Sequence, residues 1–493
     1  KNIIYEKNMK PLQIEIELKN KQIENIKDIH GGVNLIIDGN SRYFPSAYLL
    51  PGFIDSHLHF FGVGENEVVP NFRDYTSAEE IVSSLKQNPF FRDKWIYGYG
   101  WNEENFINKI LPDKKLLDTA FPNIPVCIKR IDGHSVWVNS LALQLAGMSN
   151  HPTGILADKE MEKVLKLLPR YSESQVVKMI LKAQEILFKF GITEICDMDT
   201  NPEFLNIYKN LDNNNQLKMR IHAYIQEDND GYLRYIREPY FGNMFSVDGV
   251  KFYADGAFGS HSAALFEPYD DDPDNFGQIL IDPEQMIQKI QTAIDHNFQV
   301  ATHAIGDKAN HLVLDAYNKI FKNNIDKEFF LRIEHSQMVH PDDLHKFNNP
   351  RIFALIQPIH YISDSQGMAQ SRIGKRLEYA YPWRSILQNG GTLLSGSDAP
   401  IESPNPILGL DALVNSPRPQ ETLDLETAID SYTVNSLKLF KNNGNNYNFK
   451  PFYNTNFVIL NNDLSQKSFN EVRVIATVAN GEFVYLDKNL ENK

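Results

Sequence analysis

The sequence feature that most constrains the fold is an alternation between about residues 50 and 440, where short apolar runs are separated by longer helix-like stretches. This alternation is typical of βα units, which form a parallel sheet or a barrel. An eight-stranded barrel would use all but one of the nine runs. They are Ala47–Ser56, Pro125–Ile131, Ile192–Cys196, Met219–Ile225, Val247–Ala254, Phe298–Ala304, Phe330–Glu334, Ile352–Gln357 and Gly391–Gly396.

The run Pro125–Ile131 does not fit the regular spacing. It lies in a segment of well over a hundred residues between the first run and Gly191, far longer than an ordinary βα connection. We therefore interpret residues 61–180 as an insertion beside the barrel mouth, with one strand of its own. The other eight runs, within residues 51–439, predict an α/β protein with a (β/α)8 TIM-type barrel.

The two chain ends share a different pattern. Residues 12–18 alternate apolar and polar side chains, and strand-like runs recur at Phe457–Leu460 and Val472–Val478. Neither end is long enough to bury a sheet face alone. We expect residues 1–50 and 440–493 to pair into one small β-sandwich domain.

The charge balance limits the partners. The formal net charge is −14, and a basic face for nucleic acid or an anionic membrane is not apparent. Two cysteines in apolar runs, Cys127 and Cys196, predict a reducing compartment without a disulfide framework. No window has the length of a membrane span, and the first ten residues lack a signal peptide's apolar stretch. We expect a cytoplasmic protein that acts on a small molecule; homo-oligomerisation is left open.

The strongest local signal is the pair His57 and His59 at the end of the first run. Side chains alternate along a strand, so the two imidazoles point to one face and Leu58 to the other. Two imidazoles at the end of a strand form half of a site for zinc or a similar divalent ion. The alternative is two histidines in a polar loop, and the pair alone does not decide between them.

Polar residues at other strand ends favour the metal site. Two further runs end in His303 and His335, Asp398 follows the eighth run, and Lys251 lies within the fourth. The carboxyl ends of barrel strands converge on one mouth, where active sites form. A single histidine after a strand is more often structural, but four with an aspartate at matching ends are hard to explain as core packing. The sequence therefore predicts a metal centre.

These residues lie in motifs that resemble the amidohydrolase superfamily, and most closely its N-substituted formamide deformylase-like branch. The resemblance extends from about residue 45 to 440. The matching stretches are PGFIDSHLHF, DGHSVWVNSLAL, GITEICDMD, GVKFYADGAFGS, ATHAIGD, RIEHSQMVHP and LLSGSDAPIESPNP.

The resemblance implies one or two divalent ions, with zinc as the expected metal. His57 and His59 would bind the more buried ion together with Asp398, and His303 and His335 would bind the second. A hydroxide held by the metal would be the nucleophile, its pKa lowered from that of free water. Asp398 would act as general base and then as general acid.

The resemblance also implies that Lys251 is carboxylated on its amine by CO₂ and bridges the two ions. A lysine ammonium would be repelled by two cations, whereas a carbamate supplies two anionic oxygens. The alternative is a neutral, hydrogen-bonded lysine beside a single metal.

The implied reaction is cleavage of a C–N bond of amide, formamide or carbamate type in a small molecule. Two alternatives stay open. The same metals would also suit a phosphoester or lactone hydrolase, because a fold does not dictate its substrate. A metal-free, non-catalytic relative is the other, although such proteins typically lose ligands.

Three residues are expected to contact the substrate. His134 lies in the insertion and matches a family motif that faces the mouth; a structural hydrogen bond is its alternative. Trp101 would form an apolar wall, unless it packs in a core. Asp255 shares a strand face with Lys251 and would line the pocket. His222 ends the third run in a similar position.

Overall fold

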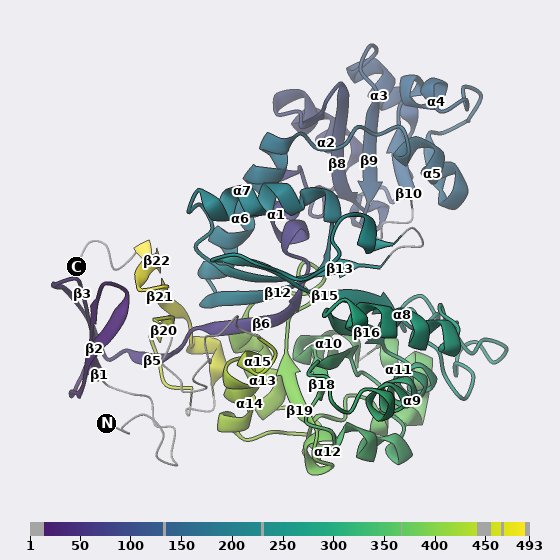
Figure 1. Cartoon of the computed structure of the whole chain (residues 1–493). Helices are drawn as coiled ribbons and strands as arrows, with labels where there is room; N and C mark the ends of the chain where they lie inside the picture. The colour runs from purple at the N-terminus through teal and green to yellow at the C-terminus, as the bar shows by residue number, and fades with distance from the viewer. Residues whose placement is uncertain are drawn as a thin grey trace. The chain divides into compact units, whose positions relative to one another are not determined.

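The computed structural model forms two compact units, Lys1–Phe60 with Gln184–Lys493, and Phe61–Ala183. Each unit is described by itself, and Figure 1 labels its elements. The described residues are 14–131, 135–227, 231–365, 367–440, 455–464 and 468–488.

The first unit contains a nearly closed barrel of eight parallel strands, as the eight apolar runs predict. Just after the last barrel strand, the backbone N–H of Asp398 donates to the carbonyl of His57 within the first strand at 2.7 Å, so the last strand meets the first. A short strand, β14 (Tyr240–Phe241), pairs antiparallel with β15. The barrel strands are, in sheet order, β6 (Phe53–Leu58), β12 (Ile192–Thr200), β13 (Arg220–Gln226), β15 (Phe245–Tyr253), β16 (Gln299–Ala304), β17 (Leu331–His335), β18 (Ile352–Ile356) and β19 (Thr392–Ser395).

The first apolar run is not one strand, which corrects the sequence interpretation. It divides into β5 (Tyr48–Pro51), which pairs antiparallel with β20 (Phe457–Leu460), and the barrel strand β6. Gly52 joins them, and a Cβ there would lie 2.4 Å from Thr193 Oγ1. The apolar pattern continues through this glycine, so the change of sheet is invisible in the sequence.

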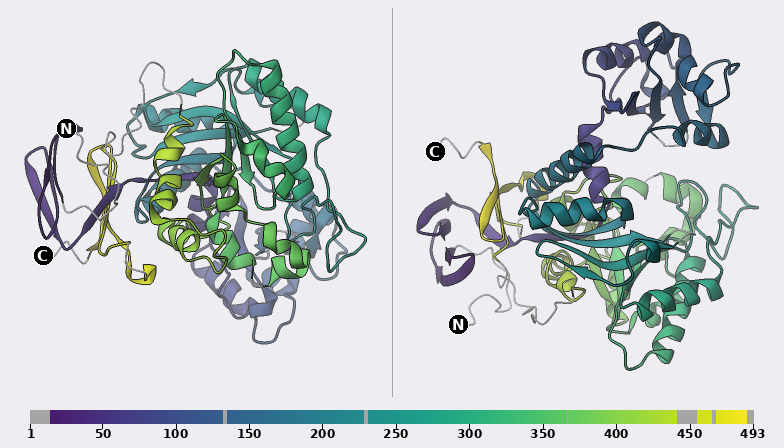
Figure 2. Two further views of the ribbon diagram at one scale, coloured as in Figure 1. Left: turned by 90° about the horizontal axis from the view of Figure 1, so that it is seen from below. Right: turned by 45° about the horizontal axis from the view of Figure 1, so that its top comes forward.

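Helices follow most barrel strands and lie outside them in the views of Figure 2. In α8 the side chain of Asp282 accepts hydrogen bonds from the N–H groups of Glu284 and Gln285, which caps the helix. One face of α8 then buries Met286 and Ile290 at helical spacing. The helices of this part of the chain are α7 (Leu205–Asn213), α8 (Pro283–Asp295), α9 (Asp307–Asn323), α10 (Pro358–Asp364), α11 (Met368–Ile373), α12 (Trp383–Gln388), α13 (Pro406–Val414), α14 (Leu425–Ser431) and α15 (Val434–Leu437).

Strands from both chain ends form two four-stranded sheets, in the orders β2-β1-β3-β4 and β22-β21-β20-β5. Their side chains share one hydrophobic cluster, which includes Ile16 and Leu35 from one sheet and Ile459 and Val478 from the other. Both sheets belong to the same compact unit as the barrel, so the boundaries of a separate β-sandwich domain stay a prediction. The remaining strands are β1 (Ile14–Lys19), β2 (Gln22–Asp28), β3 (Gly32–Ile37), β4 (Asn40–Pro45), β21 (Val474–Ala479) and β22 (Glu482–Leu486).

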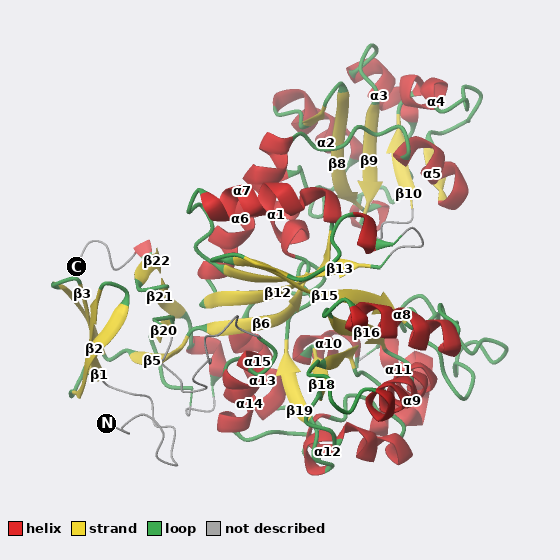
Figure 3. Cartoon of the chain, in the orientation of Figure 1, coloured by secondary structure: helices red, strands yellow, loops and turns green. Residues whose placement is uncertain are grey.

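The second unit contains a five-stranded sheet, so the prediction of a single strand here is wrong. Among the strands of this sheet that were not predicted, β8 contains two glycines, Gly98 and Gly100, and glycine usually weakens a strand. A Cβ at Gly98 would lie 2.6 Å from the ring of Phe72, so the glycine serves close packing there. Figure 3 shows the strands of this sheet with helices packed around them. Its strands are, in sheet order, β11 (Ile155–Ala157), β10 (Ser135–Val138), β9 (Val126–Arg130), β8 (Trp95–Trp101) and β7 (Phe91–Arg92).

The described α-helices of this part of the chain are α1 (Phe60–Val68), α2 (Ala78–Gln87), α3 (Lys114–Ala120), α4 (Ser140–Leu145), α5 (Asp158–Leu165) and α6 (Glu173–Phe188). Across all described residues, no helix combines the length and apolar character that crossing a membrane requires.

Candidate metal centre

The carboxyl ends of the barrel strands open into a cavity of about 370 Å³. The structure brings all six residues proposed as metal ligands to its wall. They are His57, His59, Lys251, His303, His335 and Asp398.

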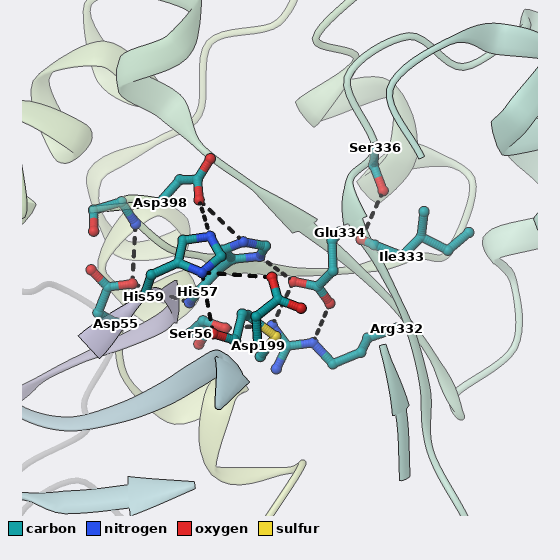
Figure 4. A network of polar contacts seen from close by, with 12 residues as sticks. Asp55, Ser56, His57, His59, Asp199, Arg332, Ile333, Glu334, Ser336 and Asp398 are labelled. Atoms are coloured by element: carbon teal, nitrogen blue, oxygen red, sulfur yellow. Dashed lines mark hydrogen bonds and ion pairs between the residues drawn. The ribbon is translucent and has the colours of Figure 1, made fainter. Parts of the chain in front are cut away.

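His57, His59 and Asp398 form one compact group. The Nε2 atoms of His57 and His59 lie 3.3 and 3.1 Å from Oδ1 of Asp398, and one donor atom from each residue lies within 4.8 Å of the others. Figure 4 shows the three side chains pointing toward one another. Strand alternation in β6 places the two imidazoles on one face, as the sequence pattern indicates.

A buried carboxylate orients His57. Its Nδ1 lies 2.5 Å from Oε2 of Glu334, whose Oε1 lies 2.5 Å from Nε of Arg332 (Figure 4). Burial raises the pKa of Glu334, but the charge of Arg332 and the hydrogen bond to His57 outweigh burial and lower the pKa to about 2. Because this carboxylate is ionised, Nδ1 donates to it and the Nε2 lone pair points into the cavity. Such a carboxylate–histidine pair typically supports a metal ligand.

A backbone carbonyl orients His59 so that, as in His57, Nδ1 donates a hydrogen bond and Nε2 is left for a ligand. Its Nδ1 lies 3.2 Å from the carbonyl oxygen of Met198, which can only accept a hydrogen bond. Nε2 therefore faces Asp398. Asp199 lies 3.6 Å from the same Nδ1 and accepts a hydrogen bond from the hydroxyl of Tyr253.

His335, His360 and Asp398 form a second group whose donor atoms lie within 4.8 Å of one another. Nε2 of His360 is 3.7 Å from Oδ2 of Asp398, and its ring is nearly parallel to that of His335 at 6.0 Å. His360 was missed in the sequence because it does not end a strand. It lies in α10, four residues after β18, although the end of a seventh barrel strand also reaches the mouth.

His303 lies beside the second group. Its ring centroid is 4.5 Å from that of His335, and its Nε2 is 3.1 Å from the carbonyl oxygen of Gly256. Since the carbonyl only accepts, Nδ1 is the nitrogen left to bind an ion. The family resemblance pairs His303 with His335, and the group whose donor atoms lie within 4.8 Å of one another joins His335 to His360 and Asp398.

Buried polar atoms without partners indicate what the two groups can hold. Among the described residues, His57 Nε2, His335 Nδ1, His360 Nε2 and Asp398 Oδ1 are buried and have no hydrogen-bond partner. A buried polar atom without a partner costs about 1–3 kcal/mol, and such atoms in native proteins point to a missing ligand. Imidazole nitrogens with a carboxylate oxygen are the donor set of zinc sites. The residues therefore fit a divalent ion.

The electrostatics of His303, His335 and Asp398 agree with that fit. Burial lowers the pKa of His303 to about 4, and the charge of Lys251 adds to the effect. Burial also lowers the pKa of His335 well below its usual value. Burial raises the pKa of Asp398, but the nearby imidazoles of His57 and His59 outweigh burial and hold that pKa well below the ordinary range. Neutral imidazoles and an ionised carboxylate are the forms that bind metals.

The backbone at two of these residues is unusual. His335 and Asp398 have φ angles of 73° and 60°, in the left-handed region that side chains other than glycine rarely adopt. Such strain is concentrated at functional sites, where the surrounding structure holds it.

Lys251 is 1% exposed within β15. Its Nζ lies 5.0 Å from the centroid of the Tyr253 ring. Within the described part of the chain, its amine has neither an ion pair nor a hydrogen bond, and it lines the cavity.

The residues expected to touch the substrate are placed elsewhere. Trp101 is 0% exposed in the core of the second unit, and its Nε1 donates to the carbonyl of Ile128 at 3.0 Å. It thus has the alternative role, core packing, and does not form a pocket wall. His134 lies outside the described residues.

Asp255 is fully buried behind the cavity. Its carboxylate accepts backbone N–H groups of Ala264, Ile305 and Gly306 at 2.8–3.0 Å, and Oδ1 lies 3.5 Å from Nε2 of His303. Burial raises its pKa to about 7. Asp255 therefore ties the segments after β15 and β16 together beside His303, which corrects its expected place on the pocket wall.

His222 is also corrected. It is the third residue of β13 and lies near the amino end of the barrel, not at the mouth. Its ring nitrogens lie 2.9 Å from Asp248 and 2.8 Å from Glu194, and its ring stacks on Phe440 at 3.5 Å.

Comparison with known proteins extends over nearly the whole chain. Residues 47–485 match the model of the amidohydrolase family. YtcJ of Bacillus subtilis (strain 168) is 30% identical over 481 residues, with 89% of each chain covered. The protein LONG AFTER FAR-RED 3 of Arabidopsis thaliana is 28% identical over 480 residues, with 89% of this chain and 82% of that protein covered.

Two solved structures resemble this one closely. One is an uncharacterized metal-dependent hydrolase from Pyrococcus furiosus, with a TM-score of 0.72, 26% identity, and coverage of 86% of this chain and 89% of that one. The other is an uncharacterized metal-dependent hydrolase from Pyrococcus horikoshii OT3, with a TM-score of 0.72, 27% identity, and coverage of 86% and 88%. The chain therefore belongs to the amidohydrolase family, and these neighbours support a metal-dependent hydrolase.

Proposed function

We propose that this protein hydrolyses a C–N bond of amide, formamide or carbamate type in a small molecule, with one or two divalent ions bound at the barrel mouth. The observation that carries the proposal is the pair of donor groups that share Asp398 and leave buried atoms without partners. The cavity of about 370 Å³ suits a small ligand.

The geometry supports two sets of residues as the ligands of the ions. His57, His59 and Asp398 would hold one, and His335 and His360 with the same aspartate would hold another. We propose zinc, because nitrogen ligands with a single carboxylate suit it. When bound, such an ion lowers the pKa of a water molecule and polarises a carbonyl.

Asp398 is the proposed general base and acid. Its oxygens face His57 and His59 on one side and His360 on the other. The carboxylate would take a proton from the attacking water, whose oxygen bonds to the carbonyl carbon. It would return that proton to the leaving nitrogen as the C–N bond breaks.

Lys251 is proposed to be carboxylated. A buried ammonium is costly without a paired charge, and no described residue forms an ion pair with this one. A carbamate would replace the positive charge by two anionic oxygens beside the metal residues. Mass spectrometry of the intact protein and ¹³C NMR after addition of labelled bicarbonate test this directly. An unmodified Lys251 at saturating bicarbonate and metal would exclude the carbamate.

Formamides are the first substrates to test, because the sequence motifs resemble the N-substituted formamide deformylase-like branch. Two experiments separate the proposal from its alternatives. Metal analysis with chelator treatment addresses the metal-free relative; a protein that neither contains nor responds to a divalent ion would refute a metal-dependent hydrolase. A panel of N-formyl, N-acetyl, carbamate, lactone and phosphoester substrates addresses the bond. Turnover restricted to lactones or phosphoesters would overturn the C–N assignment.

A further inference from the structure

Two carboxylates on the wall of the metal cavity have no role in holding an ion. Asp364 ends α10, one helical turn after His360, and Glu402 lies in the segment after β19. The cavity is a ligand site on independent grounds, because the buried, unpartnered atoms His57 Nε2 and His335 Nδ1 belong to residues that line it.

Only neutral groups contact Asp364. Its Oδ2 accepts from Nε2 of Gln337 at 3.4 Å and from the hydroxyl of Tyr381 at 3.2 Å. Oδ1 has no hydrogen-bond partner among the described residues, and no lysine or arginine there pairs with this half-buried carboxylate.

Glu402 is held in the same way. Its Oε1 accepts from the hydroxyl of Ser363 at 2.5 Å, and within the described ranges Oε2 has no partner. Burial raises the pKa of Asp364; the charge of His360 and the hydrogen bond from Tyr381 oppose this rise, and the charge of Glu402 adds to it. Two neighbouring carboxylates thus repel each other with one oxygen of each free. A cation placed between them would relieve the repulsion.

Apolar side chains make up much of the remaining wall. Phe258, Ile305, Met368 and Ile401 line the cavity. Lys251 is the one lysine or arginine among the described lining residues, and it lies with the metal ligands in the strand β15. A substrate carboxylate beside Asp364 and Glu402 would meet two like charges, whereas an ammonium would be attracted.

We infer that the substrate contains a positively charged amine as well as the scissile C–N bond, and that Asp364 and Glu402 bind this amine. Asp364 follows the metal residue His360 by one helical turn and lines the same cavity. The amine would therefore be joined to the reacting group by a short apolar chain. This inference rests on the hydrolase proposed above and names its substrate class.

The test uses three formamides with the same short alkyl chain that end in an ammonium, a hydroxyl or a carboxylate. With the zinc-loaded full-length protein, kcat/KM is measured, together with Kd by calorimetry for any compound that is not turned over. The ammonium compound should be preferred over the hydroxyl compound by about tenfold or more, as expected for hydrogen bonds to a charged group, and the carboxylate compound should be the poorest. Equal use of the ammonium and hydroxyl compounds, or a preference for the carboxylate, would overturn the inference.

Variants identify the groups responsible. Asp364→Asn and Glu402→Gln should each reduce the preference for ammonium, and the double variant should abolish it while turnover of the hydroxyl compound persists. Glu284→Gln, an exposed carboxylate in the first turn of α8, is the matched control and should retain the native preference. An unchanged preference in the folded double variant contradicts the inference.

The two proposals fail differently. Turnover without preference for ammonium refutes the substrate class and leaves the hydrolase intact. Tight binding of the ammonium compound without turnover of any formamide, amide or carbamate supports the cation site and refutes the C–N hydrolase. Neither result depends on a variant that folds.

Discussion

Both ends of the barrel bury histidines against carboxylates, but they do so differently. At the amino end, both ring nitrogens of His222 are satisfied by Asp248 and Glu194. At the carboxyl end, Nδ1 of His57 is satisfied by Glu334, while Nε2 is buried without a hydrogen-bond partner. A histidine satisfied on both sides holds the fold together. One satisfied on a single side, beside a cavity, is prepared to bind a ligand.

The largest expected effect is on the carboxyl end. Asp398→Asn removes the proposed base but keeps the shape and an oxygen of the side chain. We expect hydrolysis to fall about 10²–10⁴-fold, the usual contribution of a general base, with most of the metal retained. Steady-state kinetics and metal analysis on the same sample measure both quantities.

The matched control changes an aspartate at the other end. Asp248→Asn, beside His222, should lower stability but leave kcat per folded molecule close to the native value. A rate for Asp398→Asn within tenfold of native would contradict the role of Asp398 as the base.

The next effect concerns stability at the amino end. His222→Ala leaves Asp248 and Glu194 buried without their shared partner. Removing one partner from a buried charge group costs about 3–5 kcal/mol. Urea unfolding should show this loss, while metal content stays native in the folded protein. If His222→Ala lost metal instead of stability, the amino and carboxyl ends of the barrel would not be functionally separate.

These two ends also show how far the sequence could be interpreted. The barrel strands were predictable because strands covered on both faces are continuous apolar runs, as in Ile352–Ile356. The ligand positions His303 and Asp398 were predictable because carboxyl ends of parallel strands converge. His222 was misplaced because it was assigned to the end of its run, whereas it is the third residue of a strand that continues to Gln226.

Three features needed the structure. Arg332 and Glu334 look like the polar half of an ordinary strand, and only the fold places Glu334 on His57. His360 lies on a helix, so strand ends do not reveal it. Trp101 resembles part of a pocket wall, but it is buried in the hydrophobic core of the second unit. Each depends on contacts between residues far apart in the chain, which local pattern does not encode.

A smaller effect tests the orientation of His57. Glu334→Gln removes the negative charge from Nδ1 while keeping the shape. We expect metal affinity to fall about 10–100-fold, as when other carboxylates that support metal-binding histidines are changed. A competition titration with a zinc indicator measures it. Glu194→Gln makes the same change beside His222 and should leave zinc affinity unchanged. Equal affinities in the two variants would show that Glu334 does not support a ligand.

The smallest effect is a pH dependence of stability from His222. Burial lowers its pKa, but Asp248 and Glu194 outweigh burial and raise it above the ordinary value, which is about 6.5 in an unfolded chain. A group with a raised pKa in the folded state contributes its full stabilisation below the unfolded pKa and loses it as pH rises through the folded pKa. The unfolding free energy of the native protein minus that of His222→Gln should therefore decrease above about pH 6.5. Metal binding affects both proteins alike and cancels in this difference. A difference that does not change with pH would mean that His222 is not charged in the folded protein.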